Sequence, residues 1–250
     1  MYSFQCDFFP DFNKANLMSY YDTLTNFLTA LSRNGQIVNN HWNIVFNEAF
    51  FRLYCTAIDR DSLEPKYFNK CCHQYFSRLS KISKKRPEYR LNGEAFGLTC
   101  VCSCADPSHY ILFTTHVAEF PPVTCGDCHR PVPMYKLPKL DGDEDYFSLF
   151  QWEAEYQAFD SLFMLGDVGA RLGYRQTAEA DSRLTLKGIN LCQQMTEKTG
   201  KPFYYFLRKY YTPPKSDCPL CGGNWVLDHK IHGLYAYKCD RCHLLSEKSS

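Results

Sequence analysis

The sequence has no surplus of charge of either sign. Its 28 Lys and Arg residues nearly balance its 27 Asp and Glu residues, and the formal net charge is +1. Such a chain has no global field that draws it to nucleic acid or to an anionic membrane. It also lacks a basic segment followed by a long apolar run at the N-terminus, and no apolar run approaches the roughly 18 residues of a spanning helix. We therefore expect a soluble, cytoplasmic protein.

Recognisable catalytic patterns are also missing. Gly166, Gly169 and Gly173 form neither a dinucleotide fingerprint nor a phosphate-binding loop. His116 and Glu119 could form an acid–base pair, but nothing in the sequence orients them. No pattern assembles a nucleophile, a base and an oxyanion donor. We therefore expect that the protein is not an enzyme, and no small-molecule substrate is evident.

Cysteine, in contrast, is abundant. The chain has 14 cysteines, several in tight pairs that are typical of metal sites or redox motifs in a reducing compartment. Near the C-terminus, Cys218 and Cys221 are followed after 17 residues by Cys239 and Cys242, which is the spacing of a four-cysteine zinc ribbon. Two thiolates two residues apart can share one tetrahedral ion, with each sulfur about 2.3 Å from zinc. Free thiols or a redox pair are the alternatives, which the repeated spacing disfavours.

A second group of cysteines lies in the middle of the chain. Cys102 and Cys104 precede the pair Cys125 and Cys128, and we expect these four to bind a second Zn²⁺. Cys100 is an alternative to Cys102 as a ligand. The possible histidine substitutes are His109, His116 and His129. Alternating cysteines could instead be small core residues of a strand. A site with four cysteine ligands leaves no position for a water molecule, so both metal sites are expected to be structural.

The hydrophobic periodicity predicts an α+β fold, with an antiparallel sheet and packed helices plus a small C-terminal four-cysteine zinc ribbon. Helices are expected at 16–33, from Ser62 onward, at 147–165 and from Asp181 or Ser182 to 199, with strand-like segments at 37–58, 95–104 and 203–211 and a loop at 166–173. The proline-containing segment 212–215 is expected to separate a main domain, 1–211, from the ribbon, 216–250. A zinc knuckle is also expected at 100–130, inside the main domain.

Aromatic residues make up 16% of the chain and suggest a protein partner, because Tyr and Trp anchor interfaces. Trp225, Tyr235 and Tyr237 of the ribbon are the candidate anchors. A protein of this kind would act as an adaptor or as an immunity protein that neutralises a toxin. The alternative partner is nucleic acid, with Lys84, Lys85 and Arg86 as candidate phosphate contacts. We favour the protein partner, because the whole chain is nearly neutral.

The cysteine motifs and their flanking residues also resemble an uncharacterised bacterial family of zinc-ribbon-containing proteins with a suggested nucleic-acid-binding role. The likeness runs from Leu98 onward, and the N-terminal third resembles no family we can name. It is carried by Cys102-Ser103-Cys104-Ala105-Asp106-Pro107, the strand 110–114, Cys125-Gly126-Asp127-Cys128 with Pro131-Val132-Pro133, Cys218-Pro219-Leu220-Cys221-Gly222-Gly223 and His232-Gly233-Leu234. The resemblance implies zinc binding.

Overall fold

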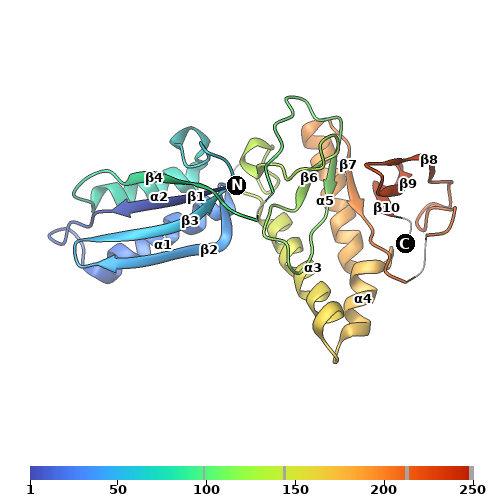
Figure 1. Ribbon diagram of the computed structural model, residues 1–250, viewed down its shortest axis with the longest axis horizontal. Coiled ribbons are helices and arrows are strands. Elements are labelled where there is room, and N and C mark those ends of the chain that lie inside the picture. Colours follow the sequence, from blue (N-terminus) through green and yellow to red (C-terminus); the bar gives the residue numbers. More distant parts are fainter. Residues whose placement is uncertain (98, 143–144, 212–213, 248–250) are drawn as a thin grey trace. The chain divides into compact units, whose positions relative to one another are not determined.

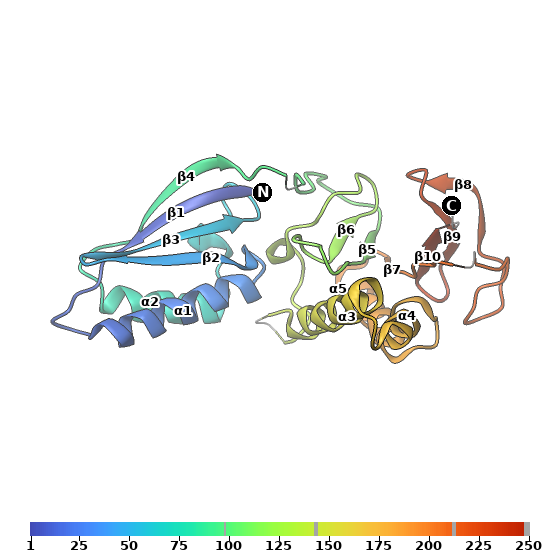
Figure 2. The same cartoon turned by 60° about the horizontal axis from the view of Figure 1, so that its bottom comes forward.

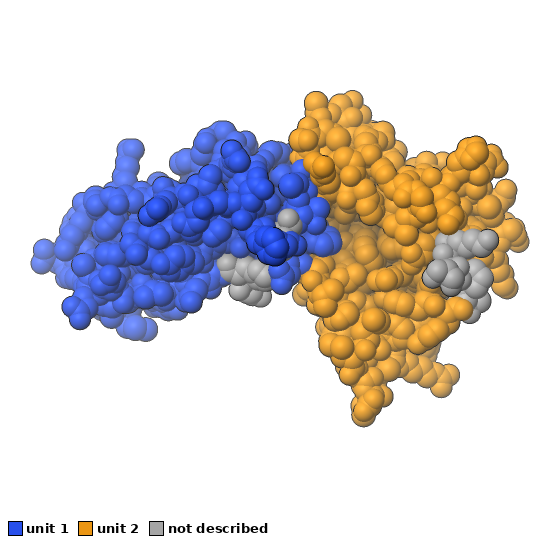
Figure 3. Space-filling view, viewed as in Figure 1, with its two compact units in different colours: residues 1–101, 119–121, 132–146 blue, residues 102–118, 122–131, 147–250 orange. Residues whose placement is uncertain are grey.

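The chain folds into two compact units in the computed structural model, which describes residues 1–97, 99–142, 145–211 and 214–247 (Figure 3). Unit 1 comprises residues 1–101, 119–121 and 132–146, and unit 2 comprises residues 102–118, 122–131 and 147–250. This division differs from the expected boundary at 212–215, of which residues 212 and 213 lie outside the described residues. Each unit is described separately below.

Unit 1 is an α+β sandwich with a βαββαβ order (Figure 1). Its elements are β1 (Tyr2–Phe8), α1 (Leu17–Arg33), β2 (Ile37–Asn47), β3 (Phe50–Ala57), α2 (Lys70–Lys81) and β4 (Glu88–Glu94), with 3-10 turns at Pro65–Tyr67 and Met134–Lys136. The four strands are antiparallel in the order β2-β3-β1-β4. This is the ferredoxin-like topology, in which the helices cover one face of the sheet.

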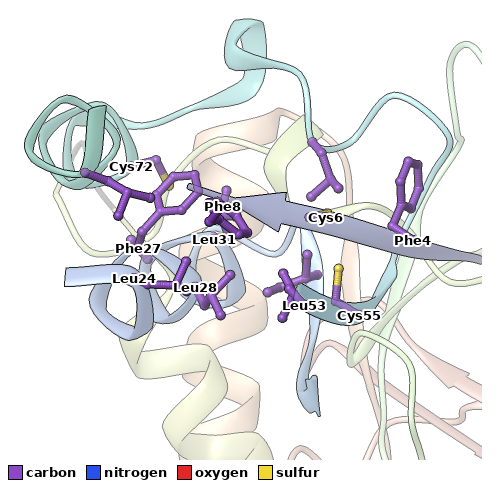
Figure 4. Packing of buried hydrophobic residues seen from close by; sticks show 14 of the residues in the cluster. Phe4, Cys6, Phe8, Leu24, Phe27, Leu28, Leu31, Leu53, Cys55 and Cys72 are labelled. Carbon is purple, nitrogen blue, oxygen red and sulfur yellow. The ribbon is translucent and has the colours of Figure 1, made fainter. Parts of the chain in front are cut away.

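Alternation along β1 fixes the side of the sheet that the helices cover. Phe4, Cys6 and Phe8 are buried and belong to the same hydrophobic core as Leu24 and Leu28 of α1 (Figure 4). The intervening residues of β1 lie on the opposite face. The local signals agree with this packing, because the Asn16 side chain caps α1 by accepting from the Ser19 amide.

Unit 2 is built on a six-stranded mixed sheet. Its strands are β5 (Tyr110–Leu112), β6 (Val123–Cys125), β7 (Phe203–Phe206), β8 (Val226–Ile231), β9 (Tyr235–Cys239) and β10 (Leu244–Glu247). They lie in the order β6-β5-β7-β10-β9-β8, and β7 is parallel to both of its neighbours. The helices are α3 (Phe147–Leu165), α4 (Ala170–Ala178) and α5 (Arg183–Thr199). The predicted α+β class, with antiparallel strands and packed helices, is confirmed.

The ribbon strands are part of this larger sheet. Leu244 and Leu245 of β10 pair with Tyr205 and Phe206 of β7, and both leucines are fully buried. Main-chain hydrogen bonds therefore run without a break from β6 to β8. The ribbon, 216–250, was predicted as a separate domain after a linker, and its strand β10 continues the sheet of unit 2 by pairing with β7.

Helix α5 packs closely on β7. A Cβ atom on Gly188 would lie 2.4 Å from the Tyr205 ring, so only glycine allows this approach. Ser182 caps the start of α5, and Gly200 ends it with a φ of 67°. Among the described residues, none of the helices is long and apolar enough to cross a membrane.

Candidate metal centres

The C-terminal cluster consists of Cys218, Cys221, Cys239 and Cys242. All four sulfur atoms lie within 4.8 Å of one another, and the sulfurs of Cys221 and Cys239 are 3.6 Å apart. Four sulfurs about 2.3 Å from a central ion would be separated by about 3.8 Å in an ideal tetrahedron. The cluster could therefore hold a metal ion with little rearrangement.

Tight turns bring the members of this cluster together. The Gly222 amide donates to the Cys218 carbonyl at 2.9 Å, and the Cys218 amide donates to the Gly223 carbonyl at 2.7 Å. The Gly223 amide also donates to the sulfur of Cys221, which lowers the pKa of that thiol to about 7. Burial raises the pKa of Cys239. A bound cation would offset this burial by stabilising the thiolate forms.

The second cluster consists of Cys102, Cys104, Cys125 and Cys128, and its sulfur atoms also lie within 4.8 Å of one another. Cys125 is the last residue of β6, and its sulfur accepts from the Asp127 amide at 3.4 Å. Cys102 lies in a loop, and its sulfur accepts from the Cys104 amide at 3.4 Å. This cluster too could hold a metal ion. Cys100 is exposed and lies outside it.

Three of the four cysteine pairs share one backbone feature. The residue that follows the second cysteine has a positive φ in each: 55° at His129, 70° at Gly222 and 53° at His243. This conformation is costly for a residue with a Cβ atom. The two histidines are held by side-chain hydrogen bonds, from His243 Nδ1 to the Phe203 carbonyl at 2.8 Å and between His129 Nε2 and Tyr235 at 2.8 Å.

The second cluster contacts the β8–β9 turn through histidine side chains. Besides its bond to Tyr235, the His129 ring lies 5.2 Å from the ring of His232 in the β8–β9 turn. His232 Nε2 donates to the carbonyl of Gly126, which lies between Cys125 and Cys128. Burial, and secondarily the neighbouring His232, lowers the pKa of His129, so the ring is neutral near pH 7. The Cys125–Cys128 segment is therefore joined to the ribbon hairpin by a short polar path.

The turn from Cys125 to Cys128, which we call the knuckle, lies against the ring of His109. A Cβ atom on Gly126 would lie 2.2 Å from His109 Nε2, so the main chain runs directly over the imidazole. His109 Nδ1 is 2.8 Å from Ser108 Oγ, and the Ser108 amide donates to Asp127 at 2.7 Å. His109 is therefore a support for the cluster, whereas we considered it as a ligand.

The structure corrects the predicted aromatic partner surface. Trp225, Tyr235 and Tyr237 are all buried, with Trp225 only 2% exposed. The Trp225 and Tyr237 rings pack against each other at a tilt, with their centres 5.2 Å apart, and Trp225 Nε1 donates to the Lys215 carbonyl. These rings form the core that the short ribbon strands need, so they cannot anchor a partner. The basic candidates Lys84, Lys85 and Arg86 lie in unit 1 and are exposed.

One polar arrangement was missed in the sequence. The buried carboxylate of Asp160 on α3 accepts from His116 Nδ1 at 2.9 Å and from the His116 amide at 2.8 Å. It also accepts from the Tyr210 hydroxyl at 2.9 Å. The statement that nothing orients His116 was therefore wrong. The pairing joins residues 44 positions apart, which no local pattern reveals.

Comparisons with known proteins divide the chain into three matched segments. Models named as domains of unknown function match residues 1–93 (DUF8589), 104–208 (DUF2310) and 213–250 (DUF8594). The N-terminal third, which resembled no family that we could name, thus has a family model. These names do not mention a zinc ribbon or nucleic-acid binding.

Two uncharacterized proteins of Haemophilus influenzae are similar to the chain over much of its length. One is 28% identical over 229 residues, which covers 86% of each chain. The other is 31% identical over 170 residues, covering 64% of this chain and 81% of that protein. The chain belongs to the family of this second protein. The family is bacterial, and its function is unknown.

Among solved structures, a crystal structure of an antibiotic biosynthesis monooxygenase matches 38% of this chain and 99% of its own length. The sequences are 9% identical and the TM-score is 0.29. A likeness this distant carries no argument about activity. The matched protein is named as an enzyme, and we withdraw the expectation that this chain is not one, because that expectation rested on missing motifs alone.

Proposed function

We propose that both four-cysteine clusters bind Zn²⁺ and that the two ions hold the sheet of unit 2 together. The donor chemistry supports this proposal, because four thiolates in a tetrahedral arrangement favour zinc or iron over hard cations. The position of the ligands supports it as well. Cys125 ends β6 at one side of the sheet, and Cys239 ends β9 near the other side.

We further propose that the protein binds nucleic acid. The observation that carries this proposal is the contrast in exposure between the two sets of candidate partner residues. The aromatic residues that favoured a protein partner are core residues of the ribbon, whereas Lys84, Lys85 and Arg86 are exposed. Three cations within one short loop can contact phosphates even when the net charge of the chain is small.

The salt dependence of binding tests this proposal. The full, zinc-loaded chain is titrated against fluorescein-labelled oligonucleotides, single-stranded and duplex, and fluorescence anisotropy is followed. Binding through phosphate contacts should weaken steeply between about 50 and 300 mM salt, because each contact releases counterions. An absence of binding to every oligonucleotide at low salt would refute the proposal.

A protein partner is a second candidate because of an apolar patch on unit 2. Leu165, at the end of α3, is 76% exposed, and Val168, in the turn before α4, is 89% exposed. Leu172 of α4 is half exposed. Exposed apolar side chains at the tip of a helical hairpin are typical of interaction sites. An adaptor or immunity role would use this tip and not the ribbon aromatics.

Capture from a cell lysate separates the two candidates. The tagged chain is recovered with and without nuclease treatment, and the bound protein and nucleic acid are analysed. Nuclease should remove the bound material if nucleic acid is the partner. A single protein that survives nuclease, and is lost when Val168 is replaced by Asp, would support the second candidate instead.

A further inference from the structure

In the described part of unit 1, one face of the sheet is free of helices. Both α1 and α2 lie on the same side of the four strands (Figure 2). Ser3, Gln5 and Asp7 of β1 alternate with the buried residues and therefore line the opposite face, which we call the open face. This face is solvent-accessible, since Tyr54 in the central strand β3 is 41% exposed.

Strand register places a polar row across all four strands of the open face. Tyr54 is directly opposite Asn43 of β2 on one side and Gln5 of β1 on the other. Gln5 is in turn opposite Arg90 of β4. The row therefore has one exposed aromatic ring near its centre, two amide side chains beside the ring and a guanidinium at its end. Directly opposite residues lie about 5 Å apart, so a flat ligand on the ring would be within reach of both amides.

A second group of aromatic rings lies at one end of the open face, and cations cover it. The rings of Phe9 and Phe50 are 5.8 Å apart. The Arg52 guanidinium lies 5.0 Å from the centre of the Phe50 ring, and the Lys85 ammonium lies 3.8 Å from the centre of the Phe9 ring. Aromatic rings with cations beside them thus extend from Tyr54 towards the loop that precedes β4.

The charges of the open face and its bordering loop are predominantly positive. Arg52 is bound to Asp7 through two hydrogen bonds of 2.8 and 2.7 Å, and Lys85 pairs with Glu88. The open face and the loop that precedes β4 thus carry two carboxylates and five cations. This is a local excess of 5 − 2 = +3 in a chain whose net charge is +1. The five cations are Arg52, Lys84, Lys85, Arg86 and Arg90.

We propose that the open face binds single-stranded nucleic acid, with a base stacked on Tyr54. This inference rests on the proposed nucleic-acid binding and names its surface. The amides of Asn43 and Gln5 would contact the edge of the stacked base, and Arg90 would contact the adjacent phosphate. At the Phe9 and Phe50 rings, Arg52 and Lys85 lie over the ring faces and would contact further phosphates of the strand.

The geometry of the face favours a single strand over a duplex. Bases inside a duplex are stacked on one another and hide their flat surfaces, so an exposed ring on a sheet has nothing to stack on. Single-stranded RNA and DNA both present free bases, and stacking tolerates any sequence. The charged and amide side chains also make this face a poor apolar interface for a second copy of the chain.

Fluorescence anisotropy with defined variants tests the inference. The probes are labelled oligouridylate and oligothymidylate of about 12 nucleotides and a duplex of equal length, with the full zinc-loaded chain. Tyr54→Ala should weaken single-strand binding by about 5- to 100-fold, whereas Tyr54→Phe, which keeps the ring, should bind like the wild type. Arg90→Ala should weaken binding and reduce the salt slope by about one. Arg33→Ala, an exposed position on α1, is the charge control and should have no effect.

The outcomes separate this inference from the proposed function. If the wild type binds single strands and the Tyr54→Ala and Arg90→Ala variants bind equally well, the open face is not the site, although nucleic-acid binding stands. Tighter binding to the duplex than to either single strand would also overturn the inference. If the wild type binds no probe, both fall together. A stronger signal with oligouridylate than with oligothymidylate would identify RNA as the preferred strand.

Discussion

Replacement of Gly126 by Ala is a sharp test of how the second cluster is supported. The added methyl group would lie 2.2 Å from His109 Nε2, whereas ordinary contacts between heavy atoms begin near about 3.5 Å. Either the ring or the knuckle must therefore move by about 1 Å. The ring is held by Ser108, whose amide is bound to Asp127 of the same knuckle, so neither can move alone.

A shift of about 1 Å is large for a metal site, because sulfur–metal distances tolerate only about 0.2 Å. We expect Gly126→Ala to weaken metal binding at Cys102, Cys104, Cys125 and Cys128 and to cost about 1–3 kcal/mol of unfolding free energy by overpacking. The assay is the rate and amount of zinc released to a chromogenic chelator. The variant should release one zinc ion faster than the wild type does and the other at the wild-type rate.

Two further variants control this test. Gly222→Ala adds a methyl group where nothing lies within 4 Å, so it should retain both metal ions despite the backbone strain at a φ of 70°. His109→Ala combined with Gly126→Ala removes the obstructing ring and should recover part of the lost zinc affinity. If Gly126→Ala retains both ions with wild-type release rates and stability, the support that we assign to His109 is wrong.

Three further predictions concern unit 2. Leu245→Ala removes a fully buried side chain where the ribbon joins β7, and it should lower the unfolding free energy by about 2–5 kcal/mol in a denaturant titration. A loss below about 1 kcal/mol would mean that the ribbon is not part of the core of unit 2. Tyr235→Phe removes the hydrogen bond to His129 and should cost about 1 kcal/mol, and a fully additive double-mutant cycle with His129→Ala would contradict this contact. Burial raises the pKa of Glu153 to about 8, above the ordinary pKa of a glutamate. The folded chain therefore loses stability as the pH rises from that ordinary pKa to about 8, because the carboxyl ionises more readily in the unfolded chain. Glu153→Gln should stabilise the zinc-loaded chain by about 1–2 kcal/mol at pH 9, a modest amount because this side chain keeps partial solvent access, and should have little effect near pH 5. Equal effects at pH 9 and pH 5 would refute the raised pKa of Glu153.

Local sequence signals predicted several elements well. Helix α3 spans the predicted 147–165, and α1 and α5 begin and end where Asn16, Ser182 and Gly200 mark their limits. Such capping residues act within one turn, so their effect can be read without knowledge of the fold. The cysteine pairs carry a similar local signal, because the spacing within a pair determines whether two sulfurs can face one ion.

Other elements depended on contacts that no local pattern contains. Residues 166–173 were expected to form a loop because of their glycines, but Gly173 lies inside α4, where a Cβ atom would meet the backbone of Phe159 at 2.4 Å. The second helix starts at Lys70 and not near Ser62, because Asn69 supplies the cap. The described residues of the segment 95–104 form no strand, and β1 was not anticipated.

The partner surface was the part least accessible from the sequence. An aromatic residue in a short ribbon can be a core residue or an anchor, and only the packing of Trp225 on Tyr237 distinguishes the two. The open face of unit 1 likewise depends on register, because Asn43, Tyr54 and Arg90 are far apart in the chain. Tertiary context therefore decides which polar and aromatic residues meet at a surface.

The zinc content of the purified wild-type chain tests the central claim most directly. The two four-cysteine clusters predict two Zn²⁺ ions per chain after dialysis against metal-free buffer, measured by plasma mass spectrometry alongside amino-acid analysis. A well-folded protein that contains no stoichiometric zinc would contradict the account.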